Sequence, residues 1–300
     1  MRVAERLGAG RRRLAVRSSV VATQTTSEAR SQGEEVAWSP EALQGDPHAL
    51  ADKPQRVRAM FAAIARCYDL NNRLHSFGRD RVWRREAVRE AAVRPGETVL
   101  DVACGTGDLT RLFARTHAKR VVGLDFTPEM LQIAEERRAR EAKRGSLAAA
   151  RVEYVQGDAM DLPFEDESFN VVSIAFGLRN VADPARALAE FRRVLKPRGR
   201  LVVLEFSEPR SRLLRSLHRL YTHRIMPVTA TWISKDRTGA YRYLPRSVEA
   251  FLDRRKVVET LQEAGFTAVT QRPLTFGVCV CYRGVAPAKP TAAPRRPRRR

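Results

Sequence analysis

The fold of this 300-residue chain is decided by one stretch, Val99-Leu100-Asp101-Val102-Ala103-Cys104-Gly105-Thr106-Gly107-Asp108-Leu109-Thr110. Its apolar start is typical of a strand buried on both faces of a parallel sheet. Gly105 and Gly107 allow a sharp turn and leave no side chain between the backbone and a ligand. Asp108 falls in the first turn of a helix, where the helix dipole favours a carboxylate. The stretch therefore predicts a strand, a glycine turn and a helix, with ligand binding or tight packing as the reason for the glycines.

Strands and helices alternate on both sides of this stretch. Besides 98–102, we expect strands at 120–124, 152–155, 169–174, 200–205, 266–271 and 275–282, and helices at 108–116, 128–144, 184–195 and 254–264. Two further helical patterns with an apolar face precede the first strand, and the sequence Tyr68 to Asn72 separates them. Alternation of this kind predicts an α/β fold with an open, mostly parallel sheet and right-handed crossovers.

Composition divides the chain into three parts. Residues 1–52 are rich in polar, Arg and turn-forming residues, which predicts a disordered extension, and residues 285–300 form a Pro/Arg-rich tail that is also expected to be disordered. Residues 53–284 then form one globular domain. The Arg/Ser-rich start also has the composition of an organelle transit peptide, so the mitochondrial matrix is the alternative to a cytoplasmic location.

The charge and the cysteines limit the class of protein. A net charge of +21 favours anionic partners, either nucleic acid or acidic lipid. No aromatic residues are interleaved with the basic ones as in single-strand binding platforms, so we expect no nucleic-acid partner. No apolar run reaches the length of about 18 residues that a membrane helix needs. The four cysteines are scattered without a CxxC pair, which suits a reducing compartment and predicts no metal site.

Acidic residues recur where the predicted strands end. They are Asp101, Asp125, Asp158 and Glu205. Since ligands of open α/β sheets bind beyond the carboxyl ends of the strands, this pattern predicts a ligand rim. Asp125 follows Gly105 by 20 residues, the offset at which an acidic residue binds ribose hydroxyls in dinucleotide-binding sheets.

The ligand is expected to carry a ribose but no pyrophosphate, because Thr110 occupies the third glycine position of the phosphate-binding fingerprint. S-adenosylmethionine is such a ligand. Its methionine end suits a glycine turn with a hydroxyl, and carboxylates suit its ribose and adenine. The predicted cofactor-binding residues are Gly105, Thr106, Gly107, Asp125, Phe126, Asp158 and Ala159.

The chain resembles class I methyltransferases at 101–108, 122–130 and 163–205, and more narrowly the UbiE/MenG quinone C-methyltransferases over about residues 53–284. The most specific motif is Phe176-Gly177-Leu178-Arg179-Asn180. Others are Met60-Phe61 through Asn72, Ser76-Phe77-Gly78, Val203-Leu204-Glu205-Phe206-Ser207, Tyr243-Leu244-Pro245 and Leu274-Thr275-Phe276-Gly277-Val278. The resemblance implies a Rossmann-like fold with a seven-stranded sheet, helices on both faces and an antiparallel C-terminal strand.

The resemblance also implies the reaction, which is S-adenosylmethionine-dependent C-methylation of a polyprenylated quinol. Leu124-Asp125-Phe126 and Thr275-Phe276-Gly277 favour demethylmenaquinol over 2-methoxy-6-polyprenyl-1,4-benzoquinol, the ubiquinone precursor. The catalytic candidates are Arg179, Tyr68, Asp69 and Asn72. Asp80, Ala175 and Cys281 depart from residues common in the family, so no role is carried over to them. Alternatives are a methyltransferase of another small molecule, an RNA-binding or RNA-modifying protein, and a nicotinamide oxidoreductase.

Apolar and basic residues alternate at helical spacing between 210 and 225. The apolar set is Leu213, Leu214, Leu217, Leu220, Tyr221 and Ile225, interleaved with arginines. A basic amphipathic helix is typical of peripheral contact with an anionic membrane. A helix that covers the core, or the contact of a homodimer, is the alternative.

Overall fold

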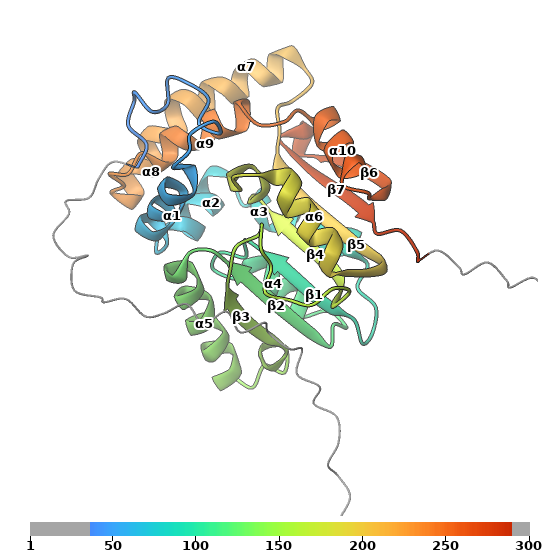
Figure 1. Cartoon of the computed structure of the whole chain (residues 1–300). Coiled ribbons are helices and arrows are strands. Elements are labelled where there is room, and N and C mark those ends of the chain that lie inside the picture. The colour runs from blue at the N-terminus through green and yellow to red at the C-terminus, as the bar shows by residue number, and fades with distance from the viewer. Residues whose placement is uncertain (1–36, 290–300) are drawn as a thin grey trace, which may run out of the picture.

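The sheet in this computed structural model, which describes residues 37–289, has seven strands in the order β3-β2-β1-β4-β5-β7-β6 (Figure 1). Their bounds are β1 (Thr98–Val102), β2 (Arg120–Asp125), β3 (Val152–Gln156), β4 (Phe169–Ala175), β5 (Leu195–Phe206), β6 (Thr267–Leu274) and β7 (Cys279–Val285). Strands β1 to β5 pair in parallel, and β7 lies antiparallel between β5 and β6. The expected mostly parallel sheet with an antiparallel C-terminal strand is confirmed.

Helices cover both faces of the sheet, as expected. One face packs against α6 (Pro184–Val194) and α10 (Arg254–Glu263), and the other against α3 (Arg79–Ala91) and α4 (Asp108–Ala114). Helix α5 (Pro128–Lys143) and the short η1 (Ala149–Arg151) lie beside β3. Successive strand residues serve the two cores in turn: Leu100 packs with α6 and α10, whereas Val99 packs with α3 and α4. This alternation explains why both faces of β1 carry apolar side chains.

A third group of helices gathers at one end of the sheet (Figure 1). It contains α1 (Lys53–Ile64), α2 (Tyr68–His75), α7 (Arg212–Leu220), a π-helical turn (Tyr221–Ile225), α8 (Met226–Ser234) and α9 (Ala240–Glu249). These helices have their own core, in which Met60, Ala230 and Tyr243 are buried. Two short turns, η2 (Leu178–Asn180) and η4 (Thr275–Gly277), follow β4 and β6. No helix among residues 37–289 is long and apolar enough to cross a membrane.

The structure corrects the predicted borders of the domain. Residues 37–52 were expected to be disordered, but Trp38 is fully buried and stacks on Tyr243. At the other end, β7 reaches Val285 and Ala286 is fully buried. The composition of 37–52 is polar and turn-rich, but its few apolar residues pack against helices that are distant in the sequence. This packing exists only in the folded protein. The rest of the predicted extensions, 1–36 and 290–300, lies outside the described residues.

The start of β5 is a second correction. The expected helix at 184–195 and the expected strand at 200–205 left Lys196 to Gly199 outside both elements, yet β5 already begins at Leu195. Leu195 pairs with Phe169 of β4, and the Ala286 amide donates to the Gly199 carbonyl. The segment is therefore held in the sheet by strands on both sides, which a local turn signal does not register.

Candidate functional site

The two glycines of the central turn have different roles. Both adopt a left-handed backbone, with φ of +54° at Gly105 and +81° at Gly107. A Cβ at Gly105 would meet no atom within 4 Å, whereas a Cβ at Gly107 would lie 2.2 Å from the hydroxyl of Tyr154. Gly105 thus leaves space beside the backbone, and Gly107 is required for packing on β3.

Asp125 ties this turn to the end of β2. Its carboxylate accepts hydrogen bonds from the amides of Gly105, at 2.7 Å, and Thr127, at 2.9 Å. Burial raises the pKa of Asp125, although these hydrogen bonds oppose the shift. The side chain is therefore a fixed acceptor at the carboxyl end of the sheet.

A cavity of about 120 Å³, the small cavity, lies beside Asp125. Five of the seven predicted cofactor-binding residues line it: Gly105, Asp125, Phe126, Asp158 and Ala159. Pro54, Val57 and Phe61 of α1 also contribute to its walls. The Asp158 carboxylate accepts from the amide of Met160 at 2.8 Å, so its orientation is fixed. The small cavity thus combines two acidic side chains with apolar walls.

Thr106 and Gly107 do not line the small cavity. The Thr106 hydroxyl points to Asp69 of α2 and lies 2.9 Å from both of its carboxylate oxygens. Asp69 also pairs with Arg137 of α5 at 2.6 Å. Asp69, a predicted catalytic residue, lines neither cavity and instead holds the glycine turn against α2 and α5.

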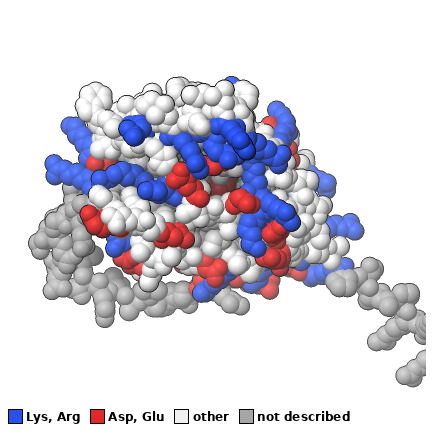
Figure 2. Space-filling view, turned by 90° about the horizontal axis from the view of Figure 1, so that it is seen from above, with Lys and Arg blue, Asp and Glu red and all other residues white. Residues whose placement is uncertain are grey.

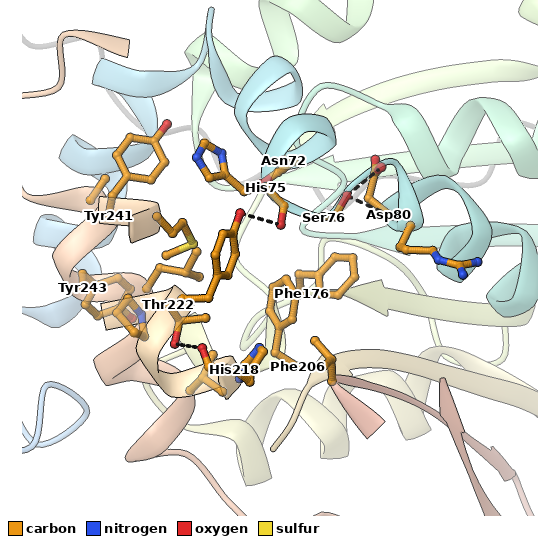
Figure 3. Close-up of a pocket in the computed structure, with 18 of the residues that line it drawn as sticks. Asn72, His75, Ser76, Asp80, Phe176, Phe206, His218, Thr222, Tyr241 and Tyr243 are labelled. Atoms are coloured by element: carbon orange, nitrogen blue, oxygen red, sulfur yellow. Dashed lines mark hydrogen bonds between the residues drawn. The ribbon is translucent and has the colours of Figure 1, made fainter. Parts of the chain in front are cut away.

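A larger cavity of about 350 Å³, the large cavity, lies between the third helix group and the ends of β4 and β5. The predicted catalytic residues Tyr68, Asn72 and Arg179 line it. Figure 3 shows Phe176, Phe206, Tyr241 and Tyr243 around the same space, with histidines at its margin. The walls thus combine several aromatic rings with charged and polar side chains.

Arg179 is a buried and fully oriented cation. Its Nη1 donates to Glu205 and to the Phe176 carbonyl, both at 2.7 Å, and its Nε donates to the Ser247 hydroxyl at 3.3 Å. Its guanidinium carbon lies 5.2 Å from the centre of the Phe206 ring. Nη2 makes no hydrogen bond with any residue in the 37–289 range, so it is the nitrogen that remains for a ligand.

The two cavities share Phe61, Tyr68 and Phe176 as walls. Burial raises the pKa of the Tyr68 phenol, so it remains protonated at neutral pH. Phe176 adopts φ of +59°, an unfavourable backbone conformation for a bulky residue. A group transferred between ligands of the two cavities would pass this junction.

Only part of the expected acidic rim lines the two cavities. Asp101 is buried and accepts from the hydroxyls of Thr110, at 2.7 Å, and Ser173, at 2.8 Å. Burial raises the pKa of Asp101 to about 6. Glu205 is occupied by Arg179. Of the four rim residues, Asp125 and Asp158 line the small cavity, and Asp101 and Glu205 line neither of the two cavities. No cluster of three or more His, Cys, Asp or Glu suited to a metal ion occurs within residues 37–289.

Several cavity residues were missed by sequence reasoning. Asp80 and Arg84 form a buried ion pair at 2.8 Å beside the large cavity, and the Tyr243 hydroxyl donates to Asn180 at 2.9 Å. His218 lines the cavity as well. Together with Tyr221 and Thr222, it follows the i, i+3, i+4 spacing of one helix face, a signal that the alternation of leucine and arginine obscured.

The leucines of α7 face outwards. Leu213 is 70% exposed and Leu217 55%, and on α8 Trp232 is 82% exposed. A core-covering role for this helix was one expectation, and it is wrong, since α7 has no buried residue. Figure 2 shows an uncharged surface at this end of the molecule, bordered by a row of Lys and Arg side chains.

Comparisons with known proteins identify the family of this chain. Residues 50–286 match the ubiE/COQ5 methyltransferase family. The demethylmenaquinone methyltransferase of Clavibacter sepedonicus is 42% identical over 246 residues, which cover 82% of this chain and 96% of the relative. That of Thermus thermophilus is 46% identical over 229 residues, covering 76% and 100%. The ubiquinone/menaquinone biosynthesis C-methyltransferase UbiE of Geobacter sulfurreducens is 42% identical over 237 residues, covering 78% and 90%.

Solved structures support the fold. A methyltransferase in complex with its Trm112 activator from Haloferax volcanii has a TM-score of 0.53 at 22% identity, covering 76% of this chain and 97% of that one. A Thermotoga maritima S-adenosylmethionine-dependent methyltransferase has a TM-score of 0.52 at 19% identity, covering 77% and 99%. At these identities the likeness concerns the fold alone.

Proposed function

Because this chain belongs to the ubiE/COQ5 methyltransferase family, we propose that it methylates a ring carbon of demethylmenaquinol with S-adenosylmethionine as the methyl donor. The observation that carries the proposal is the pair of cavities that share Phe61, Tyr68 and Phe176. One cavity has the donors and acceptors for a nucleoside, and the other has the aromatic walls for a quinol. The menaquinone branch is favoured because the similar relatives are named for menaquinone, either alone or together with ubiquinone.

The residues of the small cavity fit S-adenosylmethionine, which supplies a methyl group on a positively charged sulfur. Asp125 and Asp158 offer carboxylate oxygens to ribose hydroxyls and the adenine amino group. Phe126 offers a ring face beside them, and the Arg58 guanidinium lies 5.7 Å from its centre. The open space at Gly105 lets the ligand approach the backbone. Thr106 and Gly107 then act on the shape of the turn.

The large cavity fits the quinol ring. Its aromatic walls stack on a flat ring and exclude water. The unbonded Nη2 of Arg179 can donate to a quinol oxygen and stabilise the phenolate charge, which makes the neighbouring ring carbon electron-rich. Glu205 and Ser247 hold the guanidinium in this orientation. Most of the rate enhancement then comes from positioning and from exclusion of water.

Methylation replaces a ring hydrogen, so the enzyme must accept one proton in each turnover. We assign this role to His218. Its imidazole makes no hydrogen bond within the described part of the chain, whereas His75 and His223 are bonded to Thr229 and Glu249. Burial lowers the pKa of His218, and nearby His223 adds to the shift while Glu208 opposes it. The ring is therefore neutral at neutral pH and free to take the proton.

The exposed end of the third helix group fits an anionic membrane surface. Leu213, Leu217, Ile225 and Trp232 supply the apolar area, and neighbouring arginines complement acidic headgroups. A polyprenylated quinol remains in lipid, so its ring must be drawn from the bilayer into the protein. Peripheral contact at the cytoplasmic face of the cell membrane follows, with the mitochondrial matrix as the alternative compartment and a homodimer as the alternative use of this face.

A direct assay tests the proposed function. The purified chain is incubated anaerobically with methyl-labelled S-adenosylmethionine and either demethylmenaquinol or 2-methoxy-6-prenyl-1,4-benzoquinol. Mass spectrometry of the product should show one labelled methyl group on demethylmenaquinol and little on the benzoquinol. A preference for the benzoquinol would assign the enzyme to ubiquinone biosynthesis. If S-adenosylhomocysteine binds but neither quinol is methylated, a quinol is not the acceptor. If RNA becomes labelled in a parallel reaction, the chain is an RNA-modifying enzyme.

A further inference from the structure

Residues 37–52, the N-terminal strap, pack against the outer side of the large cavity. The Trp38 ring stacks on Tyr243 with centroids 4.1 Å apart and an interplanar angle of 19°. The Trp38 amide donates to the Thr238 carbonyl at 2.8 Å. A Cβ at Gly239, where φ is +84°, would lie 2.2 Å from the Trp38 carbonyl oxygen. The strap thus approaches the start of α9 so closely that only glycine fits there.

The far end of the strap is anchored at the same wall. The Nε2 of His48 lies 2.9 Å from the Ser247 carbonyl, near the end of α9. Immediately after the strap, the Lys53 ammonium donates to the carbonyls of Arg179, at 2.9 Å, and Val181, at 2.7 Å. Lys53 is 2% exposed, so these two carbonyls replace its hydration.

The residues that the strap contacts in α9 lead to the acceptor side of the site. Tyr243 lines the large cavity, and its hydroxyl donates to Asn180. The Ser247 hydroxyl accepts from the Nε of Arg179. Helix α9 contributes several residues to the large cavity and none to the small one. No strap residue lines either cavity. The contacts of the strap with α9 therefore lead to the acceptor side. The strap also contacts α1, where the Nη1 of Arg56 donates to the Ala37 carbonyl at 2.7 Å, and α1 lines both cavities.

The family match begins at residue 50 and so omits most of the strap. We propose that the N-terminal strap positions α9 and Arg179 for the quinol, and that it thereby sets acceptor affinity without touching the acceptor. The inference rests on the proposed function, because it names the quinol as the acceptor. Its structural part, the support of α9 by Trp38, has a separate readout.

The test compares four variants of the full chain with the wild type. Trp38→Ala removes the stack on Tyr243, Trp38→Phe retains a ring there, and Gly239→Ala disturbs the same contact from α9. Deletion of residues 1–36 is the control that leaves the strap intact. The measurements are the KM for demethylmenaquinol, kcat, the Kd of S-adenosylhomocysteine, and hydrogen exchange of backbone amides by mass spectrometry.

The expected pattern separates positioning from general damage. Trp38→Ala and Gly239→Ala should raise the quinol KM about tenfold or more, since small displacements of positioning groups are costly. The Kd of S-adenosylhomocysteine should change less than about twofold. Trp38→Phe and the deletion should behave like the wild type. Parallel loss of quinol and S-adenosylhomocysteine binding, or an unchanged KM in both disrupting variants, would overturn the proposal.

Hydrogen exchange tests the strap inference even if the protein methylates no quinol. Trp38→Ala should speed exchange in α9 and at η2, while the amides of Gly105 and Thr127 keep their protection. If exchange speeds up in this pattern but the wild type lacks activity, the strap supports α9 and the proposed function has failed. If α9 exchanges as in the wild type, the strap inference has failed whatever the activity.

Discussion

The Thr106 hydroxyl donates to the carboxylate of Asp69, with 2.9 Å to each oxygen, although the two residues are 37 positions apart. Asp69 also pairs with Arg137, so one carboxylate joins α2, the glycine turn and α5. The turn carries Gly105, which lines the small cavity. A residue that the sequence predicts to be catalytic therefore supports the glycine turn beside the small cavity, where we propose that the methyl donor binds.

Loss of this contact should weaken donor binding. Because a hydrogen bond to a charged group contributes about 1.5–3 kcal/mol, Asp69→Ala should raise the Kd of S-adenosylhomocysteine by about tenfold or more. Thr106→Val should have a smaller effect in the same direction, and Thr106→Ser should be nearly neutral. Isothermal titration calorimetry measures these values. If the variants change only the KM for the quinol and leave the Kd of S-adenosylhomocysteine unchanged, Asp69 acts on the quinol instead.

Arg179→Ala should reduce turnover far more than donor affinity. Removal of a group that stabilises developing charge costs about 10²-fold or more in kcat. Glu205→Gln should also impair turnover, and breaking a buried ion pair destabilises the fold by about 3–5 kcal/mol. Arg200→Ala is the matched control, since Arg200 forms a buried pair with Glu97 and lines neither cavity. Equal kcat losses in the two arginine variants, per folded molecule, would show that Arg179 acts only on stability.

His218→Gln should remove the acid limb of the pH profile. General-base catalysis contributes about 10²–10⁴-fold, so kcat should fall within that range. In the wild type, kcat/KM for the quinol should fall as the pH drops through the pKa of His218, which burial places below its ordinary value. His223→Gln, which removes the partner of Glu249, is the control. An acid limb that persists in His218→Gln would assign the proton to another group.

Charge placed on the exposed apolar surface of α7 and α8 should abolish the proposed membrane contact without loss of activity in solution. A Leu217→Glu/Trp232→Glu double variant should lose co-flotation with vesicles that contain phosphatidylglycerol, because charge on the apolar face opposes insertion. Leu147 is 79% exposed beside η1, away from this surface, so Leu147→Glu is the matched control. Wild-type protein that floats with neither anionic nor neutral vesicles would contradict membrane docking, and a dimer that the double variant dissociates would identify the other occupant.

Stability should depend on pH through Asp101. Its folded-state pKa of about 6 lies above the ordinary value, so the folded state retains the proton. Tighter proton binding by Asp101 in the folded state stabilises the fold. This stabilisation is complete below the pKa that the carboxyl has in the unfolded chain, and it is lost as the pH rises through about 6. Between pH 4 and pH 8, the stability of Asp101→Asn relative to the wild type should therefore increase by up to about 3 kcal/mol. Denaturant unfolding measures the free energy of unfolding of both proteins at each pH. If the two free energies change with pH in parallel, the raised pKa of Asp101 is contradicted.

The sequence predicted the parts of the site that lie on the sheet. Gly105, Asp125 and Asp158 were found because parallel strands bring their carboxyl ends to one edge. The helices above that edge were harder to place. Asp69 and His218 each lie on an ordinary amphipathic helix, and only its orientation decides which side chain meets a cavity. The acidic rim was overestimated for a different reason, since Asp101 and Glu205 lie within strands and are buried there.

The sequence by itself determined the strand, glycine turn and helix of 99–110 and the acidic residue after the next strand. These features are local, because apolar runs, glycine turns and helix starts are encoded by neighbouring residues. Only the tertiary structure decided that Thr106 binds Asp69, that the leucines of α7 face outwards, and that Trp38 belongs to the domain. Each of these depends on which surfaces of distant segments meet, and burial of a side chain is settled by its partner.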